Sequence, residues 1–587
     1  MNQPIVLVDD ARPQAGRMLA FHNPLFVIRT DRPEEVGGAL AAIEQALGQG
    51  NHVAGYASYE LGYLVEPRLS SLLPGDRRIP LLWFGVFADV EAVDAGAYLQ
   101  KRLQGRAYAG PLQHEWDEAA YAARFRWVHD FIRAGDIYQA NLSFRSRFAF
   151  AGDALALYAR LRKRSAAEHC AYIDDGERHI LSLSPELFFA IDSARRITTK
   201  PMKGTAPRGN DPVSDAAARV HLRASDKERA ENLMIVDLLR NDIGRIARVG
   251  TVTVEDLFAI ETYPTVHQMV STVAAELPSD VSASRILRAL FPCGSITGAP
   301  KIRAMEIIRE LESSSRGVYC GAIGYFAPDG SAKFNVAIRT LTISGNRGEL
   351  GIGGAVVQDS RSASEYAECL LKAKYYETAR EPIELIETLR WTVGEGFLRL
   401  DRHLARMGAS ADFFAIPFDE KIARAALSSA VASCASAMRV RLALAEDGSF
   451  AVRVEPFQET AGPWRCAVSA VPVASGDLLL HHKTNRRELF EAELAKASAQ
   501  GCEEVVFLNE RGEVTEGSRT NVFARVDGSL VTPALSSGLL NGCLRQELVE
   551  TGDCAEAILT LADLKRAEAV YLGNSLRGLV PADLKGT

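Results

Sequence analysis

The sequence predicts an α+β protein made of two units. Its 587 residues are enough for about three or four structural units of ordinary size. Apolar residues make up 47% and charged residues 24%, which excludes a disordered or collagen-like chain. Strand-like and helical segments mix up to residue 378, and the pattern starts again after Pro382. We therefore expect one unit at residues 1–378 and another at 384–587.

Charge and cysteine content indicate a cytoplasmic protein. The net charge of −7 does not suggest a nucleic-acid-binding surface. No uncharged apolar run reaches the ~20 residues that cross a bilayer, and Asp9 and Asp10 stand where a signal peptide would be apolar. The nine cysteines form no CxxC pair, which is typical of reduced thiols rather than of disulfides or structural zinc.

In the first unit, the chain begins with about 110 residues in which short apolar strands alternate with turns. A helix follows at 117–135, because apolar residues recur at helical spacing and Gly135 ends the run. Further helices are expected in three polar segments, the last two opened by glycine turns: 225–245, 291–312 and 353–373. In the second unit we expect strands at 437–448 and 504–517, and a helix within 483–501.

One carboxyl group stands out before any comparison is made. Glu186 lies between apolar neighbours in "LSPELFF", and burial there would raise its pKa and make it a candidate general acid. The helical carboxylates of 225–245 and 353–373 are, taken singly, more typical of solvated faces. The "GSITGAPK" segment does not match a phosphate-binding loop, so a nucleotide site is not expected.

Taken together, the polar segments of the first unit resemble the chorismate-binding family. This family includes anthranilate synthase component I, aminodeoxychorismate synthase component I, isochorismate synthase and salicylate synthase. The resemblance covers most of residues 50–375, where seven motifs occur in the family's order. It implies an α+β fold with two sheets in a layered sandwich, and a Mg²⁺-dependent site for chorismate.

The resemblance also implies roles for individual residues. Glu231 and Glu368 match the Mg²⁺ ligands that hold the ring carboxylate, and hard oxygen ligands suit this metal. Arg339, assisted by Tyr325, would hold the other carboxylate. Glu186 matches the acid that protonates the departing hydroxyl. The remaining substrate-binding positions are Thr297, Gly353, Gly354 and Ala355.

Two positions decide which member of the family the chain resembles. Gln139 stands where the water-using synthases carry a lysine base, so we expect ammonia as the nucleophile. Lys203 in "PMKGT" resembles the "PIKGT" of aminodeoxychorismate synthases, whereas anthranilate synthases have "PIAGT". In that group the lysine is thought to add to C2 of chorismate, which requires its neutral form. The alternative for Lys203 is a surface lysine in a salt bridge.

The first unit departs from the family pattern in two places and contains no ammonia source. Ala355 occupies a glycine position, and Gln268 lies where relatives often have histidine. The chain has no glutaminase nucleophile segment, so ammonia would come from a separate glutaminase subunit or from solution.

Segments of the second unit resemble the fold-type IV pyridoxal-phosphate enzymes, which include branched-chain and D-amino-acid aminotransferases and 4-amino-4-deoxychorismate lyase. The resemblance covers residues 384–585. It implies that Lys483, otherwise a surface lysine, binds pyridoxal 5'-phosphate covalently and that Glu516 faces the pyridine nitrogen. The phosphate would bind Arg406, Cys543, Leu544 and Ser575. The leading strand is shortened to "IELIETLRW", which leaves the substrate side undefined.

The two resemblances together imply a bifunctional enzyme. It would convert chorismate and ammonia to 4-amino-4-deoxychorismate and then eliminate pyruvate, giving 4-aminobenzoate for folate synthesis. One alternative is an anthranilate synthase component fused to an aminotransferase-like domain, and another is a second unit that only docks the glutaminase. A homodimer through the second unit is a further expectation. Nucleic acid and membrane are not expected partners.

Overall fold

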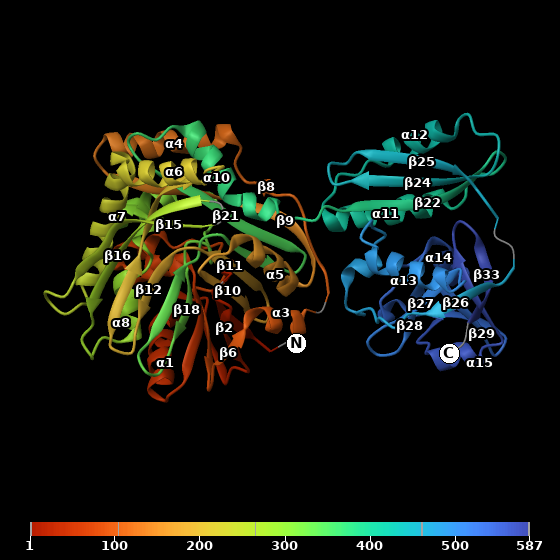
Figure 1. Ribbon diagram of the computed structural model, residues 1–587, viewed down its shortest axis with the longest axis horizontal. Helices are drawn as coiled ribbons and strands as arrows, with labels where there is room; N and C mark the ends of the chain where they lie inside the picture. The colour runs from red at the N-terminus through yellow and green to blue at the C-terminus, as the bar shows by residue number, and fades with distance from the viewer. Residues whose placement is uncertain (1–2, 14, 104, 264–265, 460–461, 585–587) are drawn as a thin grey trace. The chain divides into compact units, whose positions relative to one another are not determined.

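The structure, a computed structural model, describes residues 3–13, 15–103, 105–263, 266–459 and 462–584, and it contains two compact units (Figure 1). The first unit comprises the residues up to Arg102 together with Leu112–Phe148 and Leu157–Ala379. The second comprises Leu103–Pro111 and Ala149–Ala156 together with the residues from Arg380 onward.

The first unit is built on two large sheets. One runs in the order β17 (Gly298–Ala299), β9 (Gln139–Gly152), β21 (Arg347–Val356), β20 (Thr340–Ser344), β11 (His179–Ser184), β10 (His169–Asp174), β1 (Ile5–Asp9), β2 (Arg17–His22) and β6 (Glu91–Asp94). The other runs β14 (Met202–Pro207), β16 (Val266–Glu276), β13 (Arg196–Lys200), β12 (Leu187–Ile191), β19 (Ala332–Val336), β18 (Ala322–Phe326), β4 (His52–Ala57), β5 (Leu82–Phe87) and β3 (Phe26–Thr30). Two short strands extend these sheets: β8 (Gln113–His114) pairs with β9, and β15 (Thr253–Thr262) pairs with β16. The strand β7 (Ala107–Ala109), which lies in the second unit, pairs with the last three residues of β9, which lie in that unit too.

Ten helices are described before residue 380: α1 (Val36–Gly48), α2 (Gly62–Val65), α3 (Ala95–Arg102), α4 (Glu118–Arg133), α5 (Ala154–Ser165), α6 (Pro212–Ala224), α7 (Asp226–Gly244), α8 (Ala283–Leu290), α9 (Lys301–Leu311) and α10 (Ser362–Glu377). The helix predicted at 117–135 is α4, which begins after Asp117, whose side chain accepts from Ala120 N at 2.8 Å. It ends at Arg133, shortly before Gly135, whose positive φ of 81° ends helical backbone.

Two apolar clusters give the first unit its layers. One joins Phe21 and Ile173 of the first sheet to Trp83 and Ile323 of the second. The other joins Phe84 to helices α1, α7 and α8 on the opposite side of the second sheet. Trp83 and Phe84 are neighbours on β5 and point to opposite faces, as successive strand residues do. The predicted α+β sandwich is confirmed.

Two local expectations for the first unit were wrong. The first 110 residues contain helix α1, because Val36, Leu40 and Ile43 recur at helical spacing and are all buried. The glycine turn expected before residue 356 is instead the end of strand β21. Gly353 is needed there because a Cβ atom would lie 2.5 Å from Cβ of Ser143 on the adjacent β9.

The second unit contains two sheets. The smaller runs β23 (Gly396–Phe397), β22 (Glu384–Thr392), β24 (Met438–Ala445) and β25 (Phe450–Pro456). The larger runs β28 (Val514–Gly517), β27 (Glu504–Leu508), β26 (Trp464–Val468), β33 (Gly578–Leu584), β32 (Ala569–Asn574), β29 (Asn521–Val526), β30 (Ser529–Pro533) and β31 (Ala555–Ala557). Because β28 also pairs with β29, part of the larger sheet closes into a ring.

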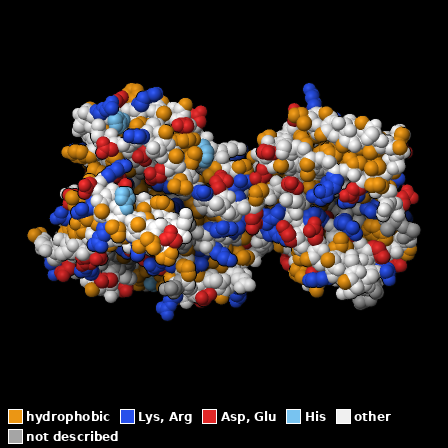
Figure 2. Space-filling model, turned by 45° about the horizontal axis from the view of Figure 1, so that its top comes forward, with side chains coloured by type: hydrophobic (Ala, Val, Ile, Leu, Met, Phe, Trp, Pro, Cys, Tyr) orange, Lys and Arg blue, Asp and Glu red, His pale blue; other side chains and the backbone are white. Residues whose placement is uncertain are grey.

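Helices cover these sheets: α11 (Leu400–Phe414), α12 (Glu420–Val431), α13 (Glu488–Ala499), α14 (Cys543–Glu550) and α15 (Leu561–Arg566). Leu389 and Leu442 of the smaller sheet pack with Leu404 of α11 and Leu427 of α12. Tyr108, from an early segment of the chain, joins this cluster. None of the described helices is long and apolar enough to cross a bilayer. Figure 2 shows acidic and basic side chains interspersed over the visible face of each unit.

Candidate functional sites

Glu186 lies between β11 and β12, and its side chain is buried. Burial raises the pKa of Glu186 to about 7, although Ser295 and Lys203 act in the opposite direction. One of its carboxyl oxygens has no hydrogen-bond partner among the described residues. A carboxyl group that keeps its proton near neutral pH and has a free oxygen is suited to general acid catalysis.

Lys203 lies on β14 and is surrounded by groups of both charges. Burial lowers the pKa of Lys203, and Lys372 adds to the lowering, whereas Glu231, Glu186 and Glu368 oppose it. No ion pair to this lysine within 4.0 Å is found in the described part of the chain. These surroundings differ from those of a surface lysine in a salt bridge, and they favour the neutral amine that a nucleophile needs.

The part of β14 that carries Lys203 is irregular in its pairing with β16, and Gln268 of β16 holds it. The Gln268 amide donates from Nε2 to the carbonyl of Gly204 at 2.8 Å, and its Oε1 accepts from the Thr205 hydroxyl at 3.0 Å. Gly204 has a φ of 86°, a conformation that favours glycine. The departure from the family pattern at residue 268 therefore lies beside the lysine that distinguishes the two ammonia-using groups.

Helices α7 and α10 each contribute two glutamates at a spacing of three residues, Glu228 and Glu231 from α7 and Glu365 and Glu368 from α10. Burial raises the pKa of Glu228, Glu231 and Glu365, and neighbouring carboxylates add to the rise. Burial acts the same way on Glu368, but Lys372, at 3.0 Å, outweighs it and lowers the pKa of Glu368. This mutual repulsion is what a divalent cation would relieve.

Arg339 has an unusual backbone and no recorded anionic partner. Its φ is 49°, in the left-handed region, and burial lowers the pKa of its guanidinium while Tyr375 opposes the lowering. No carboxylate of the described residues forms an ion pair with Arg339. The Tyr375 hydroxyl is itself buried without a hydrogen-bond partner in the described part of the chain. A half-buried cation near an unpaired hydroxyl fits a carboxylate ligand.

The other predicted substrate-binding residues differ in how they are placed. Thr297 is buried, and its hydroxyl donates to the carbonyls of Cys293 at 3.3 Å and Gly294 at 3.1 Å. Gly354 and Ala355 lie on β21, beneath α10, and Lys372 of that helix donates to the Gly353 carbonyl at 3.0 Å.

Tyr325 packs in the cluster between the sheets, with its ring centroid 5.6 Å from that of Phe21, and no recorded contact joins it to Arg339. By contrast, Gln139 of β9 is fully buried, and both polar atoms of its amide have no partner among the described residues. An unsatisfied amide of this kind is costly unless a ligand satisfies it.

The second candidate site is centred on Lys483 and Glu516. Burial lowers the pKa of Lys483 to about 8, with Glu387 opposing the shift and Arg406 adding to it. Burial also raises the pKa of Glu516 to about 8, against the influence of Arg487. The amine of Lys483 is thus neutral in an appreciable fraction near neutral pH, as an amine that attacks an aldehyde must be.

The residues predicted to bind phosphate converge at the start of α14. Cys543 and Leu544 form its first turn, whose backbone N–H groups have no partner within the helix. Gly542 precedes them, and a Cβ atom there would lie 2.0 Å from Oδ1 of Asn521. The Arg406 guanidinium reaches the same loop, donating to the Asn541 carbonyl at 3.1 Å.

Two buried residues at this end of the site were missed by sequence reasoning. Glu387 of β22 accepts from Arg406 at 2.8 and 2.6 Å, and its Oε2 lies 2.6 Å from Nδ1 of His403 on α11. His403 Nε2 lies 2.8 Å from the Ser575 hydroxyl. The spacing of His403 and Arg406 on one helix face was the available signal, but nothing in the sequence links either to Glu387.

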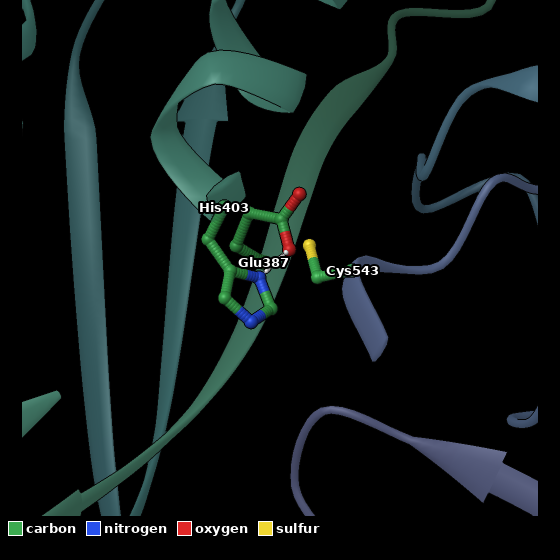
Figure 3. A group of neighbouring side chains, drawn as sticks. All are labelled: Glu387, His403 and Cys543. Carbon is green, nitrogen blue, oxygen red and sulfur yellow. Dashed lines mark hydrogen bonds and ion pairs between the residues drawn. The ribbon is translucent and has the colours of Figure 1, made fainter. Parts of the chain in front are cut away.

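Glu387, His403 and Cys543 bring ligand atoms within 4.8 Å of one another and point toward one another (Figure 3). Such a group can bind a metal ion, but both oxygens of Glu387 already accept from Arg406. A guanidinium at this position opposes a second cation. We therefore interpret the group as part of an anion site. Glu231 and Glu368 belong to no comparable group of three among the described residues.

The two-sheet first unit and the lysine site of the second unit each point to a known class of enzyme. Residues 5–377 match the model of the chorismate binding enzymes, and residues 384–584 match that of the class IV amino-transferases. The chain therefore belongs to the chorismate binding enzyme family, with a class IV amino-transferase domain after it.

Individual relatives agree with this assignment. The chain is 47% identical over 248 residues to aminodeoxychorismate synthase component 1 of Escherichia coli, covering 42% of this chain and 54% of that protein. It is 37% identical to anthranilate synthase component 1 of Thermus thermophilus, covering 57% and 78%. Anthranilate synthase component I of Streptococcus pneumoniae has a similar structure, with a TM-score of 0.54, 26% identity and 62% and 92% coverage. The chain spans about half the length of the first curated relatives it matches.

The class IV domain implies pyridoxal 5'-phosphate, and the residues present fit this cofactor. Lys483 offers a partly neutral amine, Glu516 a buried carboxyl group, and Arg406 with the first turn of α14 a cationic and N–H-rich end for the phosphate. Glu231 and Glu368 likewise offer the oxygen ligands that Mg²⁺ prefers.

Proposed function

We propose that the first unit converts chorismate and ammonia to 4-amino-4-deoxychorismate, and that the second eliminates pyruvate from this product to give 4-aminobenzoate. The observation that carries the proposal is a pair of half-buried lysines with lowered pKa, Lys203 in the first unit and Lys483 in the second. The E. coli relative, which is named an aminodeoxychorismate synthase component, supports the first reaction.

In the first reaction, different charged groups of the site would bind the two carboxylates of chorismate. Glu231 and Glu368 would hold Mg²⁺ against the ring carboxylate, and Arg339 would bind the enolpyruvyl carboxylate. Glu186 donates its proton to the departing 4-hydroxyl while the amine of Lys203 adds to C2. Ammonia then adds at C4 and the bond between C2 and Lys203 breaks, which restores the lysine.

The main competing product is anthranilate, because the chain also resembles an anthranilate synthase component. Lys203 argues against it. An amine at C2 blocks the carbon at which ammonia would have to add to give the ortho product, and it directs ammonia to C4. The unsatisfied amide of Gln139 is suited to hydrogen-bond ammonia, whereas it cannot act as a base toward water.

In the second reaction, pyridoxal 5'-phosphate would supply an electron-withdrawing group at the substrate's amine. Glu516 would hold its ring nitrogen protonated, and Arg406, Ser575 and the start of α14 would bind its phosphate. Lys483 removes the proton from C4 and returns a proton to the enolpyruvyl group, which leaves as pyruvate. The ring becomes aromatic, which drives the elimination.

We propose that ammonia comes from a separate glutamine amidotransferase, because the curated relatives include proteins named as component 1 of an aminodeoxychorismate synthase. A homodimer through the second unit stays a prediction. Magnesium is proposed on the carboxylates of α7 and α10.

Product analysis tests the proposal. The chain is incubated with chorismate, Mg²⁺, ammonium and pyridoxal 5'-phosphate, and the products are separated by chromatography and identified by mass and retention. Equal amounts of 4-aminobenzoate and pyruvate are expected. Anthranilate as the aromatic product would contradict the assignment of the first unit. Aminodeoxychorismate without 4-aminobenzoate would contradict that of the second.

A further inference from the structure

Two buried residues at the phosphate end of the second site, Glu387 and His403, have no role in the reactions proposed above, and a chain of hydrogen bonds joins them to Ser575. It runs from Glu387 to His403 at 2.6 Å and from His403 to Ser575 at 2.8 Å. Glu387 and His403 are 1% exposed and Ser575 is 6% exposed, so water cannot replace the contacts between them. While no anion is bound, the hydrogen in each of these contacts must therefore come from Glu387, His403 or Ser575.

The position of the first proton follows from the charge on Glu387. Burial opposes ionisation of this carboxyl group, but Arg406 and His403 outweigh it and hold the pKa of Glu387 well below its usual range. A carboxylate only accepts hydrogen bonds, so His403 carries a proton on Nδ1. In a neutral imidazole Nε2 is then a bare acceptor, and the Ser575 hydroxyl donates its hydrogen to it.

The surroundings of His403 favour the neutral imidazole when no anion is bound. Burial lowers the pKa of His403; Glu387 from β22 opposes the shift, while Arg406 from α11 and Lys483 add to it. Cys543 from α14 also lies nearby, and burial raises the pKa of its thiol to about 11, so it adds no charge near neutral pH. One anion thus faces two cations around the ring.

A bound phosphate changes this balance. A phosphate dianion accepts hydrogen bonds and donates none, so Ser575 can bind it only by turning its hydrogen away from His403. The hydroxyl oxygen would then face the bare Nε2 at 2.8 Å, with a lone pair on each atom. This contact is repulsive unless Nε2 gains a proton.

We propose that a phosphate monoester binding beside Ser575 makes His403 take up one proton from solvent. The new N–H at Nε2 donates to the Ser575 oxygen, and the Ser575 hydrogen is donated to the phosphate. Glu387 balances the charge of the imidazolium. His403 is thus a positioning residue that acts through Ser575, and the inference rests on the proposed cofactor site of the second unit.

Calorimetry counts the proton directly. Binding to the cofactor-free chain is measured near neutral pH in two buffers that differ in heat of ionisation, with pyridoxal 5'-phosphate and with pyridoxal, which lacks the phosphate. Attachment to Lys483 is common to both ligands and cancels in the difference. Binding of pyridoxal 5'-phosphate should be accompanied by uptake of about one proton more than binding of pyridoxal. In His403→Gln the difference should fall to the small contribution of the phosphate itself, whose second pKa is about 6.

The affinities of the chain for pyridoxal 5'-phosphate and for pyridoxal give a second readout, and further variants serve as controls. The ratio of the two affinities should fall by up to about tenfold per pH unit as pH rises through the range where His403 exchanges its proton, and it should be flat in His403→Gln. Ser575→Ala keeps the imidazole but should also lose the uptake, so it decides the matter if the histidine variant fails to fold. His221→Gln, at an exposed position of α6, should behave like the wild type.

Three outcomes separate this inference from the proposed function. Equal proton uptake with pyridoxal and its phosphate, or unchanged uptake in His403→Gln, would overturn the coupling while leaving the cofactor site intact. Inorganic phosphate supplies an arm without the cofactor: proton uptake with phosphate but no binding of the cofactor would retain the coupling and refute the proposed function. If none of the three ligands binds, both are refuted.

Discussion

At the scale of single residues, Lys203 and Lys483 share one physical property: each is half-buried, and its surroundings disfavour the charged form of the amine. Their motifs could be found in the sequence, because a lysine in "PMKGT" and one in "HHKTN" resemble family positions. Glu387 and His403 could not, because their partnership arises only when β22 and α11 pack together. Tyr325 shows the reverse: a motif position whose recorded contacts lie in the core between the sheets.

Lys203→Ala should severely slow formation of aminodeoxychorismate, because the amine that adds to C2 is lost. Elimination of pyruvate from supplied aminodeoxychorismate should be unchanged. The two rates are measured separately by chromatography, with Lys374→Ala, an exposed lysine of α10, as the matched control. Synthase activity at the wild-type rate would remove Lys203 from the mechanism.

Glu186→Gln should lower kcat/KM of the first reaction by on the order of a hundredfold, the usual contribution of a general acid. The acid must be protonated, and its pKa is raised to about 7, so wild-type activity should fall as pH rises above about 7. Rates are compared at a fixed concentration of free ammonia, since ammonia itself ionises. A wild-type profile without this fall at high pH, or one retained in the variant, would assign the proton to another group.

At the scale of elements, helices with many charged residues were predicted from the sequence, whereas the largely apolar helix α1 was not. The helix α4 was found from apolar spacing and the glycine that ends it, and α10 was found as a polar segment, although the glycine turn expected before it is strand β21. The helix α1 was missed, since Gly37 and Gly38 near its start obscure the spacing of its buried residues. That β21 continues as a strand through Gly353 depends on the approach of β9, which no local pattern contains.

Glu231→Gln and Glu368→Gln test the pairing of α7 with α10. Each should raise the Mg²⁺ concentration needed for half-maximal synthase activity by at least about tenfold. Removal of a residue that only supports a metal ligand can already lower metal affinity by this factor. The exposed Asp237→Asn on α7 should leave the requirement unchanged. Activity of either glutamine variant at ordinary Mg²⁺ would place the metal elsewhere.

Gly542→Ala tests the start of α14. Its methyl group would meet Oδ1 of Asn521, whose Nδ2 donates to the Leu540 carbonyl at 2.9 Å, so the loop before the helix must move. We expect the affinity for pyridoxal 5'-phosphate, measured by absorbance titration, to fall at least about tenfold, within the range seen when supporting groups of a site are lost. Gly476→Ala, where a Cβ atom meets nothing within 4 Å, should bind normally. Equal affinities would show that the phosphate does not bind here.

At the scale of the whole molecule, the change of pattern that predicts a second unit lies near Pro382, and the structure assigns the residues from Arg380 onward to that unit. That Leu103–Pro111 and Ala149–Ala156 pack with this unit could not be predicted, because contacts between segments so distant in the chain leave no local pattern. Each unit has its own apolar clusters, one around Phe84 in the first unit and one around Leu442 in the second. We therefore expect the two chemistries to be separable by mutation.

Lys483→Ala provides the most direct measurement of the central claim, that one chain performs both reactions in sequence. With chorismate, Mg²⁺, ammonium and pyridoxal 5'-phosphate, the wild type should release 4-aminobenzoate and pyruvate, and the variant should accumulate aminodeoxychorismate at the wild-type rate without releasing pyruvate. Lys496→Ala, an exposed lysine of α13, serves as the control and should match the wild type. Release of 4-aminobenzoate by Lys483→Ala at the wild-type rate would contradict the account.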